Sequence, residues 1–201
     1  MTDGSARSVF DAAYYERFYQ DCGTRSVTGA EVRRQMAFLC AYLKHLRLPV
    51  RRILDLGCGL GLMRKPLARH YPRARYTGVE HSAYLCQRFG WTQASVEHYQ
   101  CRWPYDLVIC HDVIQYLDEP GAARAIDNLA VLCRGVLYLG VITREDWRDN
   151  CDPQRTDDQV YLRPEHWYRR RLAKNFINIG GGLWLQRKAP VVLWTLERAS
   201  A

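Results

Sequence analysis

Apolar positions along this chain follow two different spacings. In the first fifty residues they recur every three or four positions, as on one face of a helix, and predict helices over residues 10–20 and 29–46. Further on, short unbroken apolar runs of the kind buried in parallel sheets predict strands at 52–56, 76–79, 105–110 and 135–143, with a weaker run at 94–97. Helical patterns separate them, at 62–70, 83–89, 118–133 and 164–174. Alternating strands and helices indicate an α/β fold.

The end of the chain breaks this alternation. Residues 176–187 and 190–197 read as two consecutive strands without a helix between them, which predicts a hairpin. Residues 144–162 are polar and irregular, and we interpret them as an excursion over the mouth of an active site. No internal repeat is visible.

A glycine-rich turn follows the first predicted strand. Residues 53–61 read Ile-Leu-Asp-Leu-Gly-Cys-Gly-Leu-Gly, and Glu80 closes the second predicted strand. Glycines let a backbone approach a ligand closely, and the helix after them offers free N–H groups. An acid at the end of the second strand stands where a ribose presents its hydroxyls. The segment therefore predicts a nucleotide-cofactor pocket; the alternative is a tight turn closing an ordinary βαβ unit.

The glycine spacing indicates which cofactor. A dinucleotide fingerprint is G-x-G-x-x-G, whereas the gaps here are equal, from Gly57 to Gly59 to Gly61, with Asp55 before them. This pattern resembles the first motif of class I S-adenosylmethionine-dependent methyltransferases. The resemblance implies a Rossmann-like, doubly wound, seven-stranded sheet with an antiparallel last strand, helices on both faces and an N-terminal helical lid.

The resemblance also implies a single domain over residues 1–201, made of four consecutive parts. Residues 1–48 are the expected N-terminal helices and lid, 49–143 the cofactor-binding core, 144–162 the excursion, and 163–201 the last helix and hairpin.

By the same resemblance the cofactor is S-adenosylmethionine, the product S-adenosylhomocysteine, and no metal is expected. Asp55 is expected near the amino-acid end of the cofactor and Glu80 at both ribose hydroxyls. Glu97 is the nearest candidate for the residue that reads the adenine amino group, although 94–97 is a poor strand. The predicted cofactor-binding residues are Asp55, Gly57, Cys58, Gly59, Gly61, Glu80, His81 and Glu97.

Candidates for the chemistry follow the fourth strand. His111 is the candidate general base or acceptor-orienting group because its ordinary pKa is near neutral; the alternative is that it packs against the cofactor. Asp112 is interpreted as a cap of the next turn. The Asn/Asp-Pro-Pro-aromatic motif that such enzymes use on base amines is absent from this point.

Aromatic residues are the candidates for the acceptor side, with simple packing as the alternative. The predicted acceptor-binding residues are Tyr14, Tyr15, Tyr19 and Trp147. His166 and Trp167 are expected to shape the same pocket. Residues 169–171, three arginines, are interpreted as a solvated helix face.

Charge raises the question of a nucleic-acid partner. The net charge is +8, and the segment 31–75 holds eleven Lys or Arg against Glu31 and Asp55. Seven of these cations flank the starts of strands and are expected at the edge opposite a ligand. They are Lys44, Arg47, Arg51, Arg52, Arg69, Arg73 and Arg75. A small-molecule acceptor is therefore preferred over nucleic acid, which stays open.

Composition fixes the expected compartment. Eight scattered cysteines without a C-x-x-C spacing are interpreted as reduced thiols, which predicts a cytoplasmic protein without a metal site. No apolar run is long enough to cross a membrane, and we expect no signal peptide.

Three functional hypotheses result. The first is a methyltransferase that methylates an oxygen or nitrogen of a small molecule. The second is a methyltransferase acting on RNA or protein, and the third a non-catalytic cofactor-binding or partner subunit of the same fold. A nicotinamide-dependent reductase is disfavoured by the glycine spacing and the terminal hairpin. The acceptor and the oligomeric state stay open.

Overall fold

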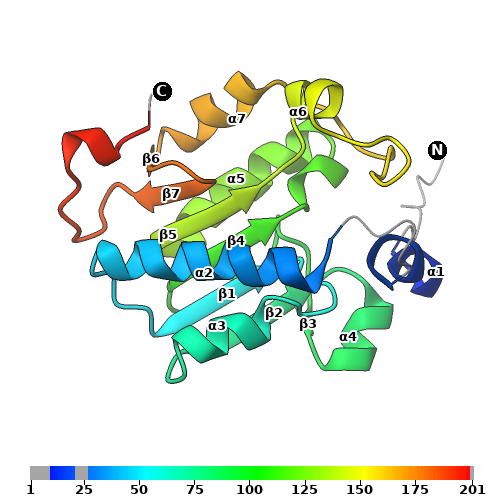
Figure 1. Cartoon of the computed structure of the whole chain (residues 1–201), viewed down its shortest axis with the longest axis horizontal. Helices are drawn as coiled ribbons and strands as arrows, with labels where there is room; N and C mark the ends of the chain where they lie inside the picture. Colours follow the sequence, from blue (N-terminus) through cyan, green and yellow to red (C-terminus); the bar gives the residue numbers. More distant parts are fainter. Residues whose placement is uncertain (1–9, 21–26, 200–201) are drawn as a thin grey trace.

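Seven strands form one sheet in the order β3-β2-β1-β4-β5-β7-β6 (Figure 1). The computed structural model describes residues 10–20 and 27–199, apart from the side chains of residues 19 and 20. Strand β7 alone runs against the others. The strands are β1 Arg52–Leu56, β2 Arg75–Glu80, β3 Thr92–Gln93, β4 Tyr105–His111, β5 Cys133–Gly140, β6 Phe176–Asn178 and β7 Leu183–Gln186. The predicted fold, with its antiparallel last strand, is confirmed.

Helices cover both faces of the sheet. They are α1 Ala12–Tyr15, α2 Gly29–His45, α3 Arg64–His70, α4 Ala83–Phe89, α5 Glu119–Leu132, α6 Arg144–Asp149 and α7 Glu165–Leu172. Short turns of other helix types are η1 Glu16–Gln20, η2 Ile114–Tyr116 and η3 Thr195–Glu197. In Figure 1, α2 and α3 lie on one face of the sheet, α5 and α7 on the other, and α1 beside α4 near the ends of the central strands.

Alternate residues of the central strands enter two separate cores. Ile53 and Leu107 pack on the α2 side, whereas Leu54 and Val108 pack on the α5 side. Because both faces are buried, these strands read as continuous apolar runs rather than alternating ones. Thr28 caps α2 and Asp118 caps α5, which accounts for the predicted helix starts.

Three sequence predictions are corrected. The third strand is Thr92–Gln93, before the predicted 94–97, because the Ser95 side chain and carbonyl accept bonds from the next residues and turn the chain. The fifth strand ends at Gly140. The segment predicted as irregular opens with α6, capped by Thr143 and Asp146.

The terminal hairpin is present, but its strands lie within 176–186. Gly180, Gly181 and Gly182 all have positive φ and turn the chain there. Residues 190–197, predicted as the second strand, do not pair with the sheet; Val191 and Leu193 pack against the α2-side core instead.

Several expected absences concern only the described residues. None of the described helices is long and apolar enough to span a bilayer. The seven described cysteines are free thiols, while Cys22 lies outside the described residues. Within residues 10–20 and 27–199, no three His, Cys, Asp or Glu side chains gather as metal ligands.

Candidate functional site

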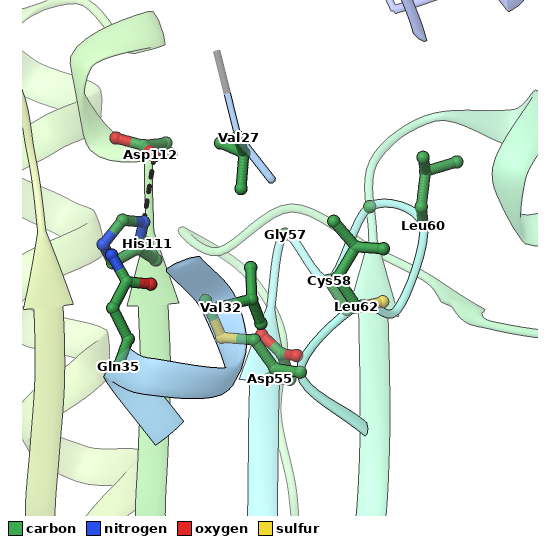
Figure 2. Close-up of a pocket in the computed structure, with 12 residues that line it drawn as sticks. Val27, Val32, Gln35, Asp55, Gly57, Cys58, Leu60, Leu62, His111 and Asp112 are labelled. Atoms are coloured by element: carbon green, nitrogen blue, oxygen red, sulfur yellow. Dashed lines mark hydrogen bonds and ion pairs between the residues drawn. The ribbon is translucent and has the colours of Figure 1, made fainter. Parts of the chain in front are cut away.

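A pocket opens where β1 and β4 end, beneath the start of α2. Figure 2 shows the glycine loop on one side of it, His111 and Asp112 on the other, and Asp55 between them. Val27, Val32 and Gln35 close it from the α2 side. A crevice beyond the carboxyl ends of parallel strands is where ligands bind in sheets of this kind.

The three loop glycines differ in what surrounds them. All have positive φ, +73° at Gly57, +50° at Gly59 and +69° at Gly61. A Cβ atom at Gly57 would overlap the Val113 side chain, and one at Gly61 would lie 2.7 Å from Trp91. A Cβ at Gly59 would meet no heavy atom within 4 Å. Gly57 and Gly61 therefore allow internal packing, whereas Gly59 leaves open space at the pocket.

Glu80 joins the loop to the end of β2. One of its carboxylate oxygens accepts from the Gly59 N–H at 2.8 Å, and the other accepts from the N–H groups of His81 and Ser82 at 2.8 and 3.0 Å. Glu80 is buried, and of the roughly four acceptor positions of a carboxylate, one on Oε2 remains beyond these three bonds. The backbone thus holds a carboxylate in place for hydroxyl donors.

Asp55, at the end of β1, is also buried. Its Oδ2 accepts from the Tyr76 hydroxyl at 2.6 Å. Burial raises the pKa of Asp55 to about 6, while the Tyr76 bond and nearby His111 oppose that rise. The ionised form of Asp55 therefore lowers the stability of the fold. Groups whose pKa is shifted in this way are frequent at functional sites.

Trp91 was not predicted from the sequence. Its indole N–H donates to the Gly59 carbonyl at 3.0 Å, and a Cβ at Gly78 would lie 2.6 Å from its ring. The Arg64 guanidinium lies 5.6 Å from the ring centroid. Trp91 therefore supports the loop from outside the pocket. A lone tryptophan before a weak strand gives no motif that would have revealed this.

His111 ends β4 and faces the pocket. Its Nδ1 lies 2.9 Å from Asp112 Oδ2, and its ring stacks on Tyr138. Asp112 raises the pKa of His111 against the lowering effect of burial, and His111 lowers that of Asp112. A side chain at Gly140 would overlap the His111 ring, so this glycine makes room for it. Asp112 has a φ of +57°, unusual outside glycine.

Two of the three tyrosines predicted for the acceptor side lie, with their side chains, in the described part of the structure. The Tyr14 hydroxyl lies 2.9 Å from that of Tyr116, a residue that the sequence did not single out. Tyr15 is buried and packs against Tyr14 at 5.2 Å between ring centroids. The Tyr19 side chain lies outside the described part of the structure. Trp147 is half-buried on α6 and is not among the residues that line the pocket.

Three other candidates, Glu97, His166 and Trp167, are not among the residues that line the pocket. Glu97 forms an ion pair with Arg124, at 2.8 Å, and its adenine role stays a prediction. Trp167 is wrongly assigned to the acceptor pocket: its indole N–H donates to Glu119 at 3.1 Å in the buried contact between α5 and α7. Helical spacing placed it on the core face of α7. His166 is exposed.

The three arginines at 169–171 have different surroundings. Arg170 is exposed as predicted, but Arg171 lies over the Trp167 ring, 3.9 Å from its centroid. Arg169 forms an ion pair with Glu165 one turn earlier.

The basic surplus lies where the sequence predicted. Arg52 and Arg75 are the first residues of β1 and β2, at the amino ends of the strands, and the pocket is at their carboxyl ends. The Asp106 side chain accepts from the Arg51 and Arg52 N–H groups and pairs with Arg134 at 2.8 Å.

Comparisons with known proteins agree with this geometry. A family model described as a methyltransferase domain matches residues 54–135. A malonyl-[acyl-carrier protein] O-methyltransferase of Anoxybacillus flavithermus is 29% identical over 121 residues, 56% of this chain and 46% of that protein. A trans-aconitate 2-methyltransferase of Pseudomonas paraeruginosa is 32% identical over 75 residues, 34% of this chain and 27% of that protein. The chain thus spans less than half the length of these relatives.

Solved structures share the fold over more of the chain. A sugar N-methyltransferase of Streptoalloteichus aligns with a TM-score of 0.63 at 21% identity, covering 94% of this chain and 99% of that one. A magnesium protoporphyrin IX methyltransferase of Synechocystis, with bound S-adenosylmethionine, aligns at 0.59 and 21% identity, covering 87% and 89%. Three observations point to the same kind of protein: the matched family model, the glycine loop with its two acids, and the strand order. Residues 54–135 thus match a methyltransferase domain, and the chain as a whole has the fold of S-adenosylmethionine-dependent methyltransferases.

Proposed function

We propose that this protein binds S-adenosylmethionine and transfers its methyl group to a nitrogen or oxygen of a small molecule. The observation that carries the proposal is the open space at Gly59 beside a backbone-held carboxylate, Glu80. A ligand with a ribose fits both features. Its hydroxyls can donate to the carboxylate, and its atoms can fill the space that a side chain at Gly59 would occupy.

The residues present fit this cofactor. Glu80 would hold the ribose hydroxyls, with His81 beside it, and Asp55 would face the amino-acid end. The backbone from Gly57 to Gly61, Cys58 included, would pack along the cofactor. When bound, S-adenosylmethionine supplies a methyl group on a positively charged sulfur. The adenine contact from Glu97 remains a separate proposal.

The protein's contribution to the reaction is positioning and proton handling. His111 is the proposed general base or orienting group. Because its Nδ1 is bonded to Asp112, Nε2 is the nitrogen available to an acceptor. Holding the acceptor close to the methyl and in line with the breaking bond supplies much of the rate. Tyr14, Tyr15, Tyr19 and Trp147 are the proposed acceptor-side residues.

A small acceptor is favoured over RNA or protein by the arrangement of charge. The basic residues that would attract a polyanion lie at the amino edge of the sheet, away from the pocket. The relatives are named for malonyl-carrier and trans-aconitate substrates, and a structural neighbour for a sugar. The scattered cysteines make the cytoplasm the proposed compartment.

Labelled methyl transfer tests this function. The protein is incubated with methyl-tritiated S-adenosylmethionine and a cell extract separated into small-molecule, RNA and protein fractions. We expect label in the small-molecule fraction, and less by about tenfold or more with the Glu80→Ala variant at a cofactor concentration below saturation. Label in RNA or protein would favour the second hypothesis. Binding of the cofactor without transfer to any fraction would favour the non-catalytic one.

A further inference from the structure

Two buried side-chain acceptors on the carboxyl-end side of the sheet, behind the residues that line the pocket, have no hydrogen-bond partner. Among the described residues, buried side-chain atoms without a partner are Gln115 Oε1, Asp157 Oδ2 and Arg52 Nε. Arg52 begins β1 at the opposite edge of the sheet. Buried polar atoms are nearly always bonded, so two orphaned acceptors on the pocket side indicate a donor that arrives with a ligand.

Gln115 belongs to the hydrogen-bonded network around His111, and Asp157 lies on the segment that packs against η2. The Gln115 side-chain amide donates to Asp112 Oδ1 at 3.2 Å, and Asp112 Oδ2 bonds His111. The backbone carbonyl of Gln115, not its side-chain oxygen, accepts from the Tyr161 N–H at 2.7 Å, which ties η2 to the segment that carries Asp157. Burial and the nearby carboxylates of Asp157 and Asp112 raise the pKa of Tyr14. The Tyr14 hydroxyl, which bonds that of Tyr116 in η2 at 2.9 Å, also interacts with Asp157.

The charge of this region is negative. The ionisable side chains that line the pocket include Asp55, His111 and Asp112, and no Lys or Arg is among the lining residues described. The buried Arg163 is near η2 but donates to the carbonyls of Leu117 and Tyr161. An acceptor carrying a carboxylate would face like charges here, whereas a cation or an N–H donor would find partners.

We propose that the methyl acceptor is an amine, recognised through its N–H groups by Asp157 and Gln115. This inference rests on the proposed function. An amine reacts through its nitrogen lone pair: the N–C bond forms as the S–C bond breaks, and the electron pair of that bond stays on sulfur. The nitrogen then carries one proton too many, and His111 Nε2 or water takes it. An amine is bound as an ammonium ion by carboxylates but attacks only after it has passed one proton to solvent water. The proton released after methyl transfer is the one that His111 Nε2 or water takes.

Matched trios of acceptors test the class. Cyclohexylamine, cyclohexanol and cyclohexanecarboxylate share a ring and differ in the reacting group; benzylamine, benzyl alcohol and benzoate form a second trio, and 3-amino-3-deoxyglucose, glucose and glucuronate a third. Methyl transfer from labelled S-adenosylmethionine is followed, with S-adenosylhomocysteine binding measured on the same protein. We expect transfer to at least one amine, and a kcat/KM for it at least about tenfold above those of its two partners.

Transfer to an alcohol or carboxylate at an equal or higher kcat/KM overturns the amine assignment. So does a protein that binds S-adenosylhomocysteine yet methylates no amine of the three trios. Failure to bind S-adenosylhomocysteine is a different result, because it contradicts the proposed function itself.

Two neighbouring aspartates offer a matched pair of variants. Asp157 is half-buried beside Tyr14, whereas Asp158 is exposed and bonds Gln159 at 3.1 Å. With the amine that is methylated best, Asp157→Asn is expected to raise KM about tenfold or more while S-adenosylhomocysteine affinity stays within about twofold. Asp158→Asn removes the same charge and should leave KM unchanged. Equal effects of the two variants would show that Asp157 does not bind the amine.

Discussion

A Cβ atom at Gly59 would meet no neighbour within 4 Å, although the residues around it are packed closely enough to exclude one at Gly57. The fold thus leaves a space at Gly59 that no side chain of the protein fills. Gly90 offers a comparison: it ends α4 with a φ of +71°, and a Cβ there would also meet nothing within 4 Å. Gly90 is not among the residues that line the pocket.

Comparison of Gly59→Ala with Gly90→Ala should therefore distinguish the cost of backbone strain from the loss of cofactor affinity. Each places alanine in the left-handed region, which costs about 1 kcal/mol of unfolding free energy. Gly59→Ala should in addition weaken S-adenosylhomocysteine binding, by about tenfold or more, because the new methyl group occupies ligand space. Urea unfolding and calorimetry measure the two effects. Similar affinities for the two variants would contradict the role given to Gly59.

Asp55 makes a prediction about stability and pH. Its folded-state pKa is about 6, above the ordinary 3.8, so the folded protein holds this proton more tightly than the unfolded chain. Stability therefore falls as pH rises from about 4 to about 6. Asp55→Asn removes that dependence and still accepts the Tyr76 bond. Its unfolding free energy relative to wild type should rise by on the order of 2 kcal/mol between pH 4.5 and pH 7.

Urea unfolding at pH 4.5, 5.5 and 7 measures this change. Asp158→Asn, at an exposed position, is the control and should track wild type at all three values. A pH-independent difference between Asp55→Asn and wild type would mean that burial does not raise this pKa.

Residues at strand ends were predictable, while residues around them were not. Asp55, Glu80 and His111 each end or follow a strong apolar run, so their place at the carboxyl edge follows from a parallel sheet. Trp91 and Asp157 carry no local pattern. They reach the site only because the glycine loop, α1 and the 150–162 segment come together in space.

At the level of elements, the start of α1 is bonded to Ser82, the residue that caps α4. The Ser82 hydroxyl donates to the Phe10 carbonyl at 2.7 Å, just before α1, and its oxygen caps α4 by accepting from the Leu85 N–H. The Ser82 N–H also donates to Glu80. The lid and the carboxylate expected to bind ribose therefore share an anchor.

Ser82→Ala should loosen α1 without unfolding the protein. Loss of the cap costs about 1 kcal/mol of unfolding free energy, and loss of the Phe10 bond should speed amide exchange over residues 12–18. Thr143→Ala removes the cap of α6 and serves as the control, since it should cost similar stability without changing exchange in α1. Unchanged exchange in Ser82→Ala would show that α1 is held elsewhere.

The elements show where local patterns are insufficient. The apolar residues at 190–197 have strand-like composition, but three consecutive glycines had already turned the chain at 180–182. Both hairpin strands therefore lie earlier, and Val192, Trp194 and Leu196 remain exposed. Composition predicted a hairpin; only the turn determines which residues form it.

For the molecule as a whole, the basic residues and the pocket lie at opposite edges of one sheet. Exposed cations gather before the strands, and within the described residues no acid lies within ion-pair distance of Lys44, Arg47, Arg51, Arg69, Arg73 or Arg75. Carboxylates gather beyond the strand ends, at Asp55, Glu80 and Asp112. The seven-stranded sheet with its antiparallel last strand was predictable through the family resemblance, whereas the acceptor side depends on tertiary contacts that no motif records.

Calorimetric titration with S-adenosylhomocysteine tests the central claim most directly, because it needs no acceptor. Wild type should bind it, and Glu80→Ala should bind about ten- to a hundredfold more weakly, as expected for loss of charged hydrogen bonds to the ribose. Glu165→Ala, which removes an exposed carboxylate on α7, is the control and should bind like wild type. Absence of binding by folded wild type, or equal affinity in Glu80→Ala, would contradict the assignment of this pocket.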